Sequence, residues 1–205
     1  ISDPVGAKLV KHLERPEGNV TGLSNKVPVK QTIDLMRELT PEAKRIGVLY
    51  ASNEDNSLSQ VKSFSQLAQK KGYQVIPYAV PSTNEVPTTM SIMLSKVDAI
   101  FIPQDNTIAS AFSSVITASK AAKVPVYSSV DTMVKEGSLA SISQSQYQLG
   151  VETANQVLRL IKGKAVADIS VKVINHGKPL INKKVAEELG IPMSQHLLDT
   201  VSFVE

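Results

Sequence analysis

RIGVLY (Arg45–Tyr50) is the first of four short apolar runs that decide the fold of this chain. The others are YQVIPYAV (Tyr73–Val80), VDAIFI (Val97–Ile102) and VPVY (Val124–Tyr127). All four are rich in β-branched and aromatic residues, which favour strands. Each run ends in a polar loop rather than a tight hairpin turn, and an amphipathic stretch follows it. Strands that alternate with helices in this way predict an α/β fold, in which helices flank parallel sheets.

Helical periodicity appears between and around these strands. An apolar stripe at Leu58, Val61, Phe64 and Leu67 predicts one helix, and Gly72 is placed to end it. Further helices are predicted over residues 29–39, 147–162 and 183–189, and a strand over residues 171–174. The helix over 147–162 is expected to bury its apolar residues, namely Leu149, Ala154, Val157, Leu158 and Ile161.

The composition excludes several classes of function. The 205 residues are 42% apolar and 20% charged, which is ordinary for a globular protein. The formal net charge of +3 is the balance of 22 basic and 19 acidic residues, too small and too scattered for a nucleic-acid partner. The absence of cysteine excludes disulfides and thiol chemistry, and the three histidines are scattered. We therefore expect neither a metal nor a cofactor.

The sequence also bears on targeting. No apolar run approaches the roughly 18 to 20 residues that span a bilayer, so we expect a soluble chain. It has no charged start followed by an apolar stretch and a cleavage site, so we expect no signal peptide within these residues. Residues 1–5 read like the end of a strand that enters a loop, and we expect the chain to be truncated at its N-terminus.

Ligand contacts are expected in the polar loops that follow the strands, because open α/β sheets bind ligands beyond the carboxyl ends of their strands. The candidates are Asn53, Asn56 and Ser57 in the first loop, Gln104, Asp105 and Asn106 in the second, and Ser129 and Asp131 in the third. Backbone N–H groups at residues 56–57 and 106–107 are candidates for binding a carboxylate. For each residue taken alone the alternative is helix capping, because these residue types are common N-caps.

Enzymatic interpretations have less support. The sequence contains no G-x-S-x-G nucleophile motif, no G-x-x-x-x-G-K-[ST] phosphate loop and no G-x-G-x-x-G fingerprint. Asp105 and Asp131 could form a carboxylate pair for acid–base work or metal binding. No lysine or nucleophile is placed to complete such a site, so we expect a binding protein and not an enzyme.

Four stretches carry a resemblance to a known family: SDPVGAKLVKHLERPEGNVTGLS (Ser2–Ser24), PEAKRIGVLYASNEDNS (Pro41–Ser57), VDAIFIPQDNTIAS (Val97–Ser110) and GSLASISQSQYQLGVETANQVLRLIKG (Gly137–Gly163). They resemble the ABC-transporter substrate-binding family that includes tryptophan- and tyrosine-type binding proteins and has the type I periplasmic-binding-protein fold. The first stretch is the most specific, although Lys8 and Glu17 stand where the family commonly has glycine. The resemblance covers nearly the whole chain.

The resemblance implies two α/β lobes that close on a ligand. Residues 1–42 and 146–165 would form an incomplete N-terminal lobe, and residues 43–145 and 166–205 the C-terminal lobe. The protein would be the extracytoplasmic solute-binding component of an ABC importer, either periplasmic or a cell-surface lipoprotein, with an ABC permease as its partner. The alternative is the effector-sensing domain of a transcription regulator, which shares this fold.

The implied ligand is an amino acid, with L-tryptophan or L-tyrosine first and a branched-chain amino acid, small peptide or sugar as alternatives. Burying an unpaired ligand charge is costly, so the site needs an acid for the ammonium group. By the resemblance, Asp131 is the first candidate and Asp105 the second, while Asp3 and Thr21 would contact the ligand from the other lobe. Tyr50 and Tyr127 are candidates for stacking on an aromatic ligand or for the core.

Overall fold

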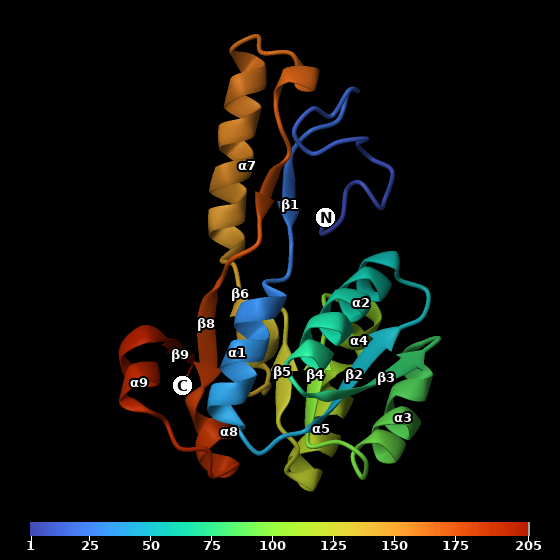
Figure 1. Ribbon diagram of the computed structural model, residues 1–205, viewed down its shortest axis with the longest axis vertical. Helices are drawn as coiled ribbons and strands as arrows, with labels where there is room; N and C mark the ends of the chain where they lie inside the picture. Colours follow the sequence, from blue (N-terminus) through green and yellow to red (C-terminus); the bar gives the residue numbers. More distant parts are fainter. Residues whose placement is uncertain (205) are drawn as a thin grey trace.

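The computed structural model describes residues 1–204 and has a larger and a smaller body (Figure 1). The larger body is built on a seven-stranded sheet in the order β3-β2-β4-β5-β6-β8-β9. Its strands are β2 (Arg45–Ala51), β3 (Gln74–Val80), β4 (Ala99–Ile102), β5 (Val126–Ser128), β6 (Ala140–Ser143), β8 (Lys178–Asn182) and β9 (Ser202–Val204). Neighbouring strands are parallel except for β6 and β8. Strands β2 to β5 correspond to the four apolar runs, so the predicted α/β class is confirmed.

The helices follow the predicted alternation with the strands. They are α1 (Val29–Leu39), α2 (Asp55–Lys70), α3 (Val86–Met93), α4 (Asn106–Ser110), α5 (Phe112–Ala122), α6 (Asp131–Lys135), α7 (Gln146–Ile161), α8 (Lys183–Glu188) and α9 (Gln195–Thr200). Short 3-10 turns lie at Thr83–Glu85 and Val166–Asp168. Gly72 has a φ of 92° just beyond α2, as expected of the glycine that ends a helix.

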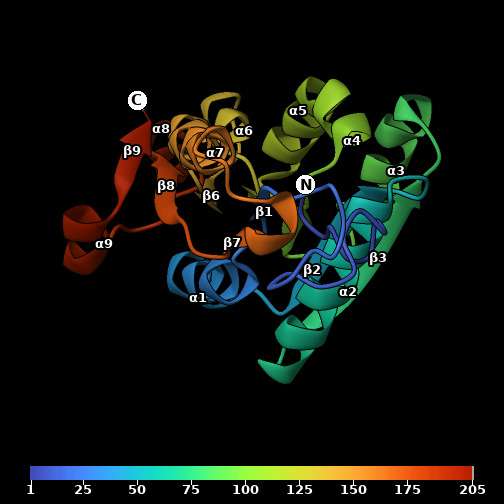
Figure 2. The same ribbon diagram turned by 90° about the horizontal axis from the view of Figure 1, so that it is seen from above.

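Alternate side chains of the central strands pack into two separate apolar layers, because successive residues of a strand point to opposite faces. Ile46 and Val48 of β2 and Phe101 of β4 pack with residues of α1 and α2. Leu49 and Ile100 pack with residues of α3 and α5 on the opposite face. Figure 2 shows α1 and α2 on one side of the sheet and α4 and α5 on the other. The larger body is therefore a doubly wound sheet with a core on each face.

The smaller body contains β1 (Leu23–Asn25), β7 (Lys172–Ile174), α7 and the coil of residues 1–22. β1 and β7 form a two-stranded parallel sheet, and α7 packs beside β1. The expected burial of the apolar stripe of α7 was wrong: Leu158 is 50% exposed and Ile161 is 74% exposed. Within residues 1–204 no element covers this side of the helix.

Two residues that depart from the family pattern have an unusual backbone conformation. Lys8 has a φ of 56° and Glu17 a φ of 54°. This left-handed region suits glycine, because other residues place Cβ too close to the backbone there. The glycine that the family commonly shows at both positions thus has a conformational reason.

The chain passes between the two bodies three times, after β1, after β6 and after β7. Two of these crossing segments contact each other: Gln144 Nε2 donates a hydrogen bond to the His176 carbonyl at 2.7 Å. Gly177 lies so close to Ser143 that a Cβ there would come within 2.6 Å of the Ser143 carbonyl oxygen. Gln31 of α1 accepts a hydrogen bond from the Gly177 N–H at 3.1 Å. The connection between the bodies therefore consists of three crossing segments that lie together, and α1 holds them to the larger body.

The division expected from the sequence differs from the packing at two segments. α1 was placed in the lobe of residues 1–42, but its Ile33, Met36 and Leu39 belong to the core of the seven-stranded sheet. β7 was placed with residues 166–205, but it pairs with β1 in the smaller body. The chain thus crosses between the bodies near residues 26 and 176, and not near 42 and 166. Apolar packing of α1 and pairing of β7 with β1 decide which body each segment belongs to.

Asp98 stabilises the amino-terminal edge of the sheet. Its carboxylate accepts hydrogen bonds from the N–H groups of Lys44 and Arg45 and pairs with the Arg45 guanidinium, Nη2 to Oδ1 2.6 Å. The Arg45 side-chain bond and these backbone bonds outweigh the effect of burial and lower the pKa of Asp98 from 3.8 to about 2.

A depressed carboxyl pKa makes this contact pH-dependent. The stabilisation is fully present above the unfolded pKa of 3.8 and is lost as the pH falls through about 2. We expect a loss of about 1 kcal/mol over this window, since solvent screens the partly exposed pair. Urea unfolding at pH 4 and pH 2 should show a smaller pH effect for Asp98→Asn than for the parent chain. An equal pH effect in both would contradict this role of Asp98.

Candidate functional site

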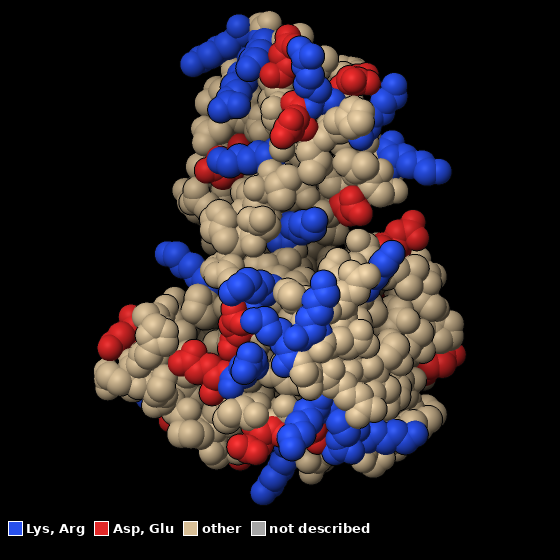
Figure 3. Space-filling view, viewed as in Figure 1, with Lys and Arg blue, Asp and Glu red and all other residues tan. Residues whose placement is uncertain are grey.

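A cavity of about 590 Å³ lies where the coil of residues 1–7 meets the carboxyl ends of β2 and β4. It is lined from the smaller body by Ile1, Ser2, Asp3, Gly6 and Ala7, and from the larger body by Asp55, Asn56, Ser59, Gln104 and Asn106. β2 and β4 are neighbours, and the chain leaves them toward opposite sides of the sheet. This is the topological switch point, where open α/β sheets bind their ligands. The space-filling view is hollowed between the two bodies, and acidic side chains are among those beside the indentation (Figure 3).

Asp105 fixes the two loops that form the floor of this cavity. It is 4% exposed, and its Oδ2 accepts hydrogen bonds from the Ala51 N–H and the Ser57 hydroxyl, both at 2.7 Å. Its Oδ1 caps α4 by accepting from the Ile108 N–H at 2.8 Å. Asp105 does not line the cavity, and protein donors occupy both of its carboxylate oxygens. The structure therefore gives Asp105 and the Ser57 hydroxyl a supporting role between the loops.

Asn56 and Gln104 join the same loops at the surface of the cavity. Asn56 Nδ2 donates to the Gln104 carbonyl at 2.6 Å, and the Gln104 N–H donates to Gln60 Oε1 at 2.8 Å. Both predicted residues line the cavity and are held in place by protein contacts.

The N-terminus of α4 is already occupied by a carboxylate of the protein. Glu54 accepts hydrogen bonds from the N–H groups of Asn106 and Thr107 at 3.1 and 2.9 Å and from both of their side chains. Burial alone would raise the pKa of Glu54, but these four bonds lower it below its usual value. The expectation that residues 106–107 offer free N–H groups to a ligand is therefore wrong, because Glu54 takes them.

The N-terminus of α2 differs from that of α4. Its N-cap residue is Glu54, whose side chain makes no capping bond to α2, and the first helical hydrogen bond runs from Leu58 N–H to the Glu54 carbonyl. Asp55, in the first turn, is exposed, and its carboxylate has no hydrogen-bond or ion-pair partner within residues 1–204. The N–H groups of the first turn, Asn56 among them, thus lie beside the cavity without a side-chain cap.

The smaller body contributes Asp3 to the cavity. Asp3 Oδ1 accepts a hydrogen bond from the Gly6 N–H at 2.9 Å, which holds the turn of residues 3–6. Thr21 does not line the cavity, and its hydroxyl donates to the Ile169 carbonyl at 2.6 Å.

Asp131 lies elsewhere, at a second cavity of about 610 Å³ beside the crossing segments. Its other lining groups include Gln144 and the ion pair of Lys172 with Glu152. Within residues 1–204 the Asp131 carboxylate accepts a hydrogen bond only from the N–H of its neighbour Thr132, at 3.0 Å. The structure thus separates Asp131 from Asp3, Asn56, Gln104 and Asn106, which it brings together.

The remaining candidates are placed away from the first cavity. Ser129 is buried, and its hydroxyl donates to the Ile102 carbonyl at 3.0 Å. Asn53 is exposed and lines none of the cavities described above. Tyr127 is 1% exposed, and burial raises the pKa of its hydroxyl, which shares a hydrogen bond with Thr40 at 2.9 Å. Tyr127 is therefore a core residue, and Tyr50 packs against the same core.

Sequence reasoning missed Asp55 and Glu54, the two acids at the start of α2. Both stand in the quoted loop after β2. An acid in the first turn of a helix is common, because its negative charge interacts favourably with the helix dipole, so it does not by itself indicate a site. The missing signal was spatial: Glu54 turns to α4, whose N-terminus lies 52 residues further along the chain. That leaves Asp55 unpaired at the cavity.

Two unequal α/β bodies, three crossing segments and a cavity between the bodies at the switch point define the class of two-lobed binding proteins with the type I periplasmic-binding-protein fold. The chain matches the family described as ABC transporter substrate binding protein over residues 1–204, and it belongs to that family. This membership confirms the predicted resemblance and the interpretation as a binding protein and not an enzyme. In the described residues no helix is both long and apolar enough to cross a membrane.

Relatives of known name extend this result. The chain is 33% identical over 205 residues to a tyrosine-binding protein from Clostridioides difficile and spans 59% of its length. It is 47% identical to the ABC domain in complex with L-Trp from Streptococcus pneumonia, with a TM-score of 0.94, and covers 70% of that chain. It is 32% identical to a ligand-free, open substrate-binding protein with adhesive properties from Clostridium difficile, with a TM-score of 0.82, and covers 68% of it. In each comparison the whole of this chain is matched.

Proposed function

We propose that this chain is the ligand-binding part of an extracytoplasmic solute-binding protein of an ABC importer, and that it binds an α-amino acid in the cavity between residues 1–7 and α2. The observation that carries the proposal is the pairing of an unpartnered carboxylate, Asp55, with the uncapped N-terminus of the same helix. An α-amino acid carries an ammonium group and a carboxylate group on the same carbon. Its ammonium group complements Asp55, and its carboxylate complements the N–H groups of the helix end. Delivery to a permease, and a periplasmic or lipoprotein location, follow from this role.

The charges around the cavity favour a ligand ammonium group. Asp3 and Asp55 line it, while no lysine or arginine among residues 1–204 does. A buried ammonium group needs an acidic partner, because an unpaired charge out of water is costly. Since Asp3 already accepts the Gly6 N–H, Asp55 is the better ammonium partner, with Asp3 facing the ligand from the smaller body.

The ligand carboxylate fits at the first turn of α2. Free N–H groups and the helix dipole both favour an anion there. The Asn56 side chain is bound to the Gln104 carbonyl, so its backbone N–H is the group left to donate. The same turn thus supplies donors for the carboxylate and an acceptor for the ammonium.

The side chain of the ligand is proposed to be aromatic. The cavity of about 590 Å³ is large enough for a small ligand of either aromatic or aliphatic type, so its size does not choose between them. The choice rests on the relatives: one is named for tyrosine and another was crystallised with L-Trp. L-Tryptophan and L-tyrosine are therefore the first ligands to test.

Calorimetric titration of the full protein tests this proposal with L-tryptophan, L-tyrosine, L-leucine and ribose. We expect binding of an aromatic amino acid, and at least about tenfold weaker binding after Asp55→Asn, because a charge-assisted bond is lost. Asp131→Asn is the matched control, since it makes the same change at the other cavity and should leave the affinity unchanged.

Two outcomes would contradict the proposal in different ways. Loss of binding in Asp131→Asn but not in Asp55→Asn would move the ammonium site to the second cavity, as the sequence alone suggested. Binding of ribose and of no amino acid would refute the amino-acid assignment itself.

A further inference from the structure

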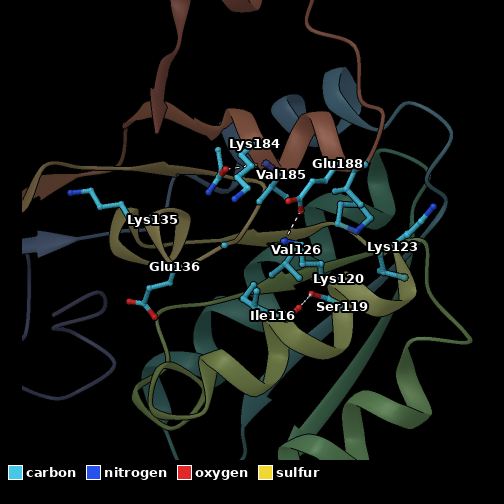
Figure 4. Close-up of a pocket in the computed structure, with 15 residues that line it drawn as sticks. Ile116, Ser119, Lys120, Lys123, Val126, Lys135, Glu136, Lys184, Val185 and Glu188 are labelled. Atoms are coloured by element: carbon cyan, nitrogen blue, oxygen red, sulfur yellow. Dashed lines mark hydrogen bonds and ion pairs between the residues drawn. The ribbon is translucent and has the colours of Figure 1, made fainter. Parts of the chain in front are cut away.

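A third cavity, of about 390 Å³, lies at the opposite edge of the larger sheet, far from the proposed amino-acid site. Three segments distant in sequence form it: the end of α5 with the start of β5, the loop after α6, and the start of α8 (Figure 4). We name it the basal pocket. The basal pocket lies at the amino-terminal ends of β5 and β6, whereas the amino-acid site lies at the carboxyl ends of β2 and β4.

The floor of the basal pocket is apolar. Its floor residues are Ile116, Val124, Val126, Val185 and Leu189. The Asn182 amide at its side is already used, because Oδ1 accepts from the Val185 N–H and Nδ2 donates to the Val134 carbonyl. The surface inside the pocket is thus mainly apolar, and its volume suits a small organic molecule.

The rim of the basal pocket carries an excess of positive charge. Its charged residues are Lys120, Lys123, Lys135, Lys184, Glu136 and Glu188. Lys120 and Glu188 neutralise each other in an ion pair of 2.7 Å, which Figure 4 shows at the mouth of the pocket. Within residues 1–204 the other three lysines have no ion-pair partner, and only Glu136 opposes them on the rim.

Two of these lysines stand where local structure does not favour them. Lys123 has a φ of 54°, a left-handed conformation that costs least in glycine. Lys184 lies in the first turn of α8, where a positive charge is unfavourable beside the helix dipole. Lys120 and Lys135 lie in the last turns of their helices, where the dipole accounts for them. Lys123 and Lys184 therefore point to a role outside helix stability.

We propose that the basal pocket is a second binding site, for a compact organic anion with an apolar body and a carboxylate or phosphate group. The apolar body packs on Val126 and Val185, and the anionic group is attracted by the excess positive charge of the rim, to which Lys123 and Lys184 contribute from opposite sides of the pocket. This site is independent of the proposed amino-acid function, because it shares no residue with the cavity at α2.

The test is an amide NMR titration of the full protein with sodium benzoate and, separately, with sodium phosphate, at constant ionic strength. Benzoate should shift the amide resonances around Val124, Gly137 and Val185 and should bind more tightly than phosphate, which has no apolar part. The double variant Lys123→Gln/Lys184→Gln should bind benzoate about tenfold more weakly. Lys62→Gln/Lys70→Gln removes two exposed lysines of α2 and should leave binding unchanged.

Each other result would overturn the proposal. Shifts that are absent, or spread over the surface without a cluster at the basal pocket, would show that no site exists. If both double variants bound benzoate equally more weakly, the loss would come from the lower net charge of the protein and not from the basal pocket. Phosphate binding without benzoate binding would exclude the apolar part of the ligand. Asp55→Asn should leave the titration unchanged, so the test is separate from that of the amino-acid site.

Discussion

Replacement of Asp105 by alanine is expected to lower the free energy of unfolding by about 3 kcal/mol. Three buried or partly buried donors converge on its carboxylate, namely the Ala51 N–H, the Ser57 hydroxyl and the Ile108 N–H. Each bond to a charged group contributes about 1.5–3 kcal/mol, and donors left unpaired in the interior cost free energy as well. The Ile108 bond is also the α4 N-cap, whose loss alone costs about 1 kcal/mol, and relaxation of the loops recovers part of the total. Urea denaturation followed by circular dichroism measures the change.

Asp131→Ala is the control for this substitution. Asp131 also follows a strand, at the first position of α6, but within residues 1–204 its side chain accepts a hydrogen bond only from the neighbouring Thr132 N–H, so we expect a change within about 0.5 kcal/mol. Similar losses in the two variants would show that the network around Asp105 does not stabilise the fold. A loss confined to Asp105→Ala would establish that the loops under the cavity are held by this one carboxylate.

The contrast between these two aspartates shows how far the sequence could define the site. The strands and the loops after them followed from composition and spacing, since β-branched runs and polar turns are local signals. For Asp105 taken alone the sequence favoured capping but left ligand contact open, because both use the same residue type. Its deciding partner, the Ala51 N–H, lies 54 residues earlier and is brought close only by the pairing of β2 with β4.

Other features of the fold could not be predicted from the sequence because they also depend on contacts between distant segments. The spacing in residues 147–162 located α7 nearly to its ends but predicted a buried stripe, because periodicity shows which face is apolar and not what covers it. β9 has three residues, too few for a periodic signal, and it joins the sheet only because β8 offers an edge. Asp55 was overlooked because its importance depends on Glu54 turning toward another helix.

Phe101→Ala is expected to lower the free energy of unfolding by about 3–5 kcal/mol, the usual cost of replacing a buried phenylalanine by alanine. Phe101 of β4 is fully buried, and its ring stacks on Phe64 of α2 with centroids 4.0 Å apart and planes 8° from parallel. This pair packs α2 against the sheet, and the first turn of α2 contributes Asp55 and Asn56 to the cavity. The substitution should therefore loosen the proposed amino-acid site as well as the core. Chemical denaturation gives the first effect and ligand titration the second.

Phe101→Leu separates stacking from filling the core. Leucine keeps most of the apolar volume, so a loss of about 1.5 kcal/mol or less is expected for it. A double-mutant cycle with Phe64→Leu then isolates the ring–ring contact, for which about 0.5–1.5 kcal/mol of coupling is expected. Coupling near zero would show that the rings contribute only as apolar volume. A Phe101→Ala protein that keeps full stability would contradict the placement of α2 on this strand, and with it the position of the uncapped helix end that the amino-acid site requires.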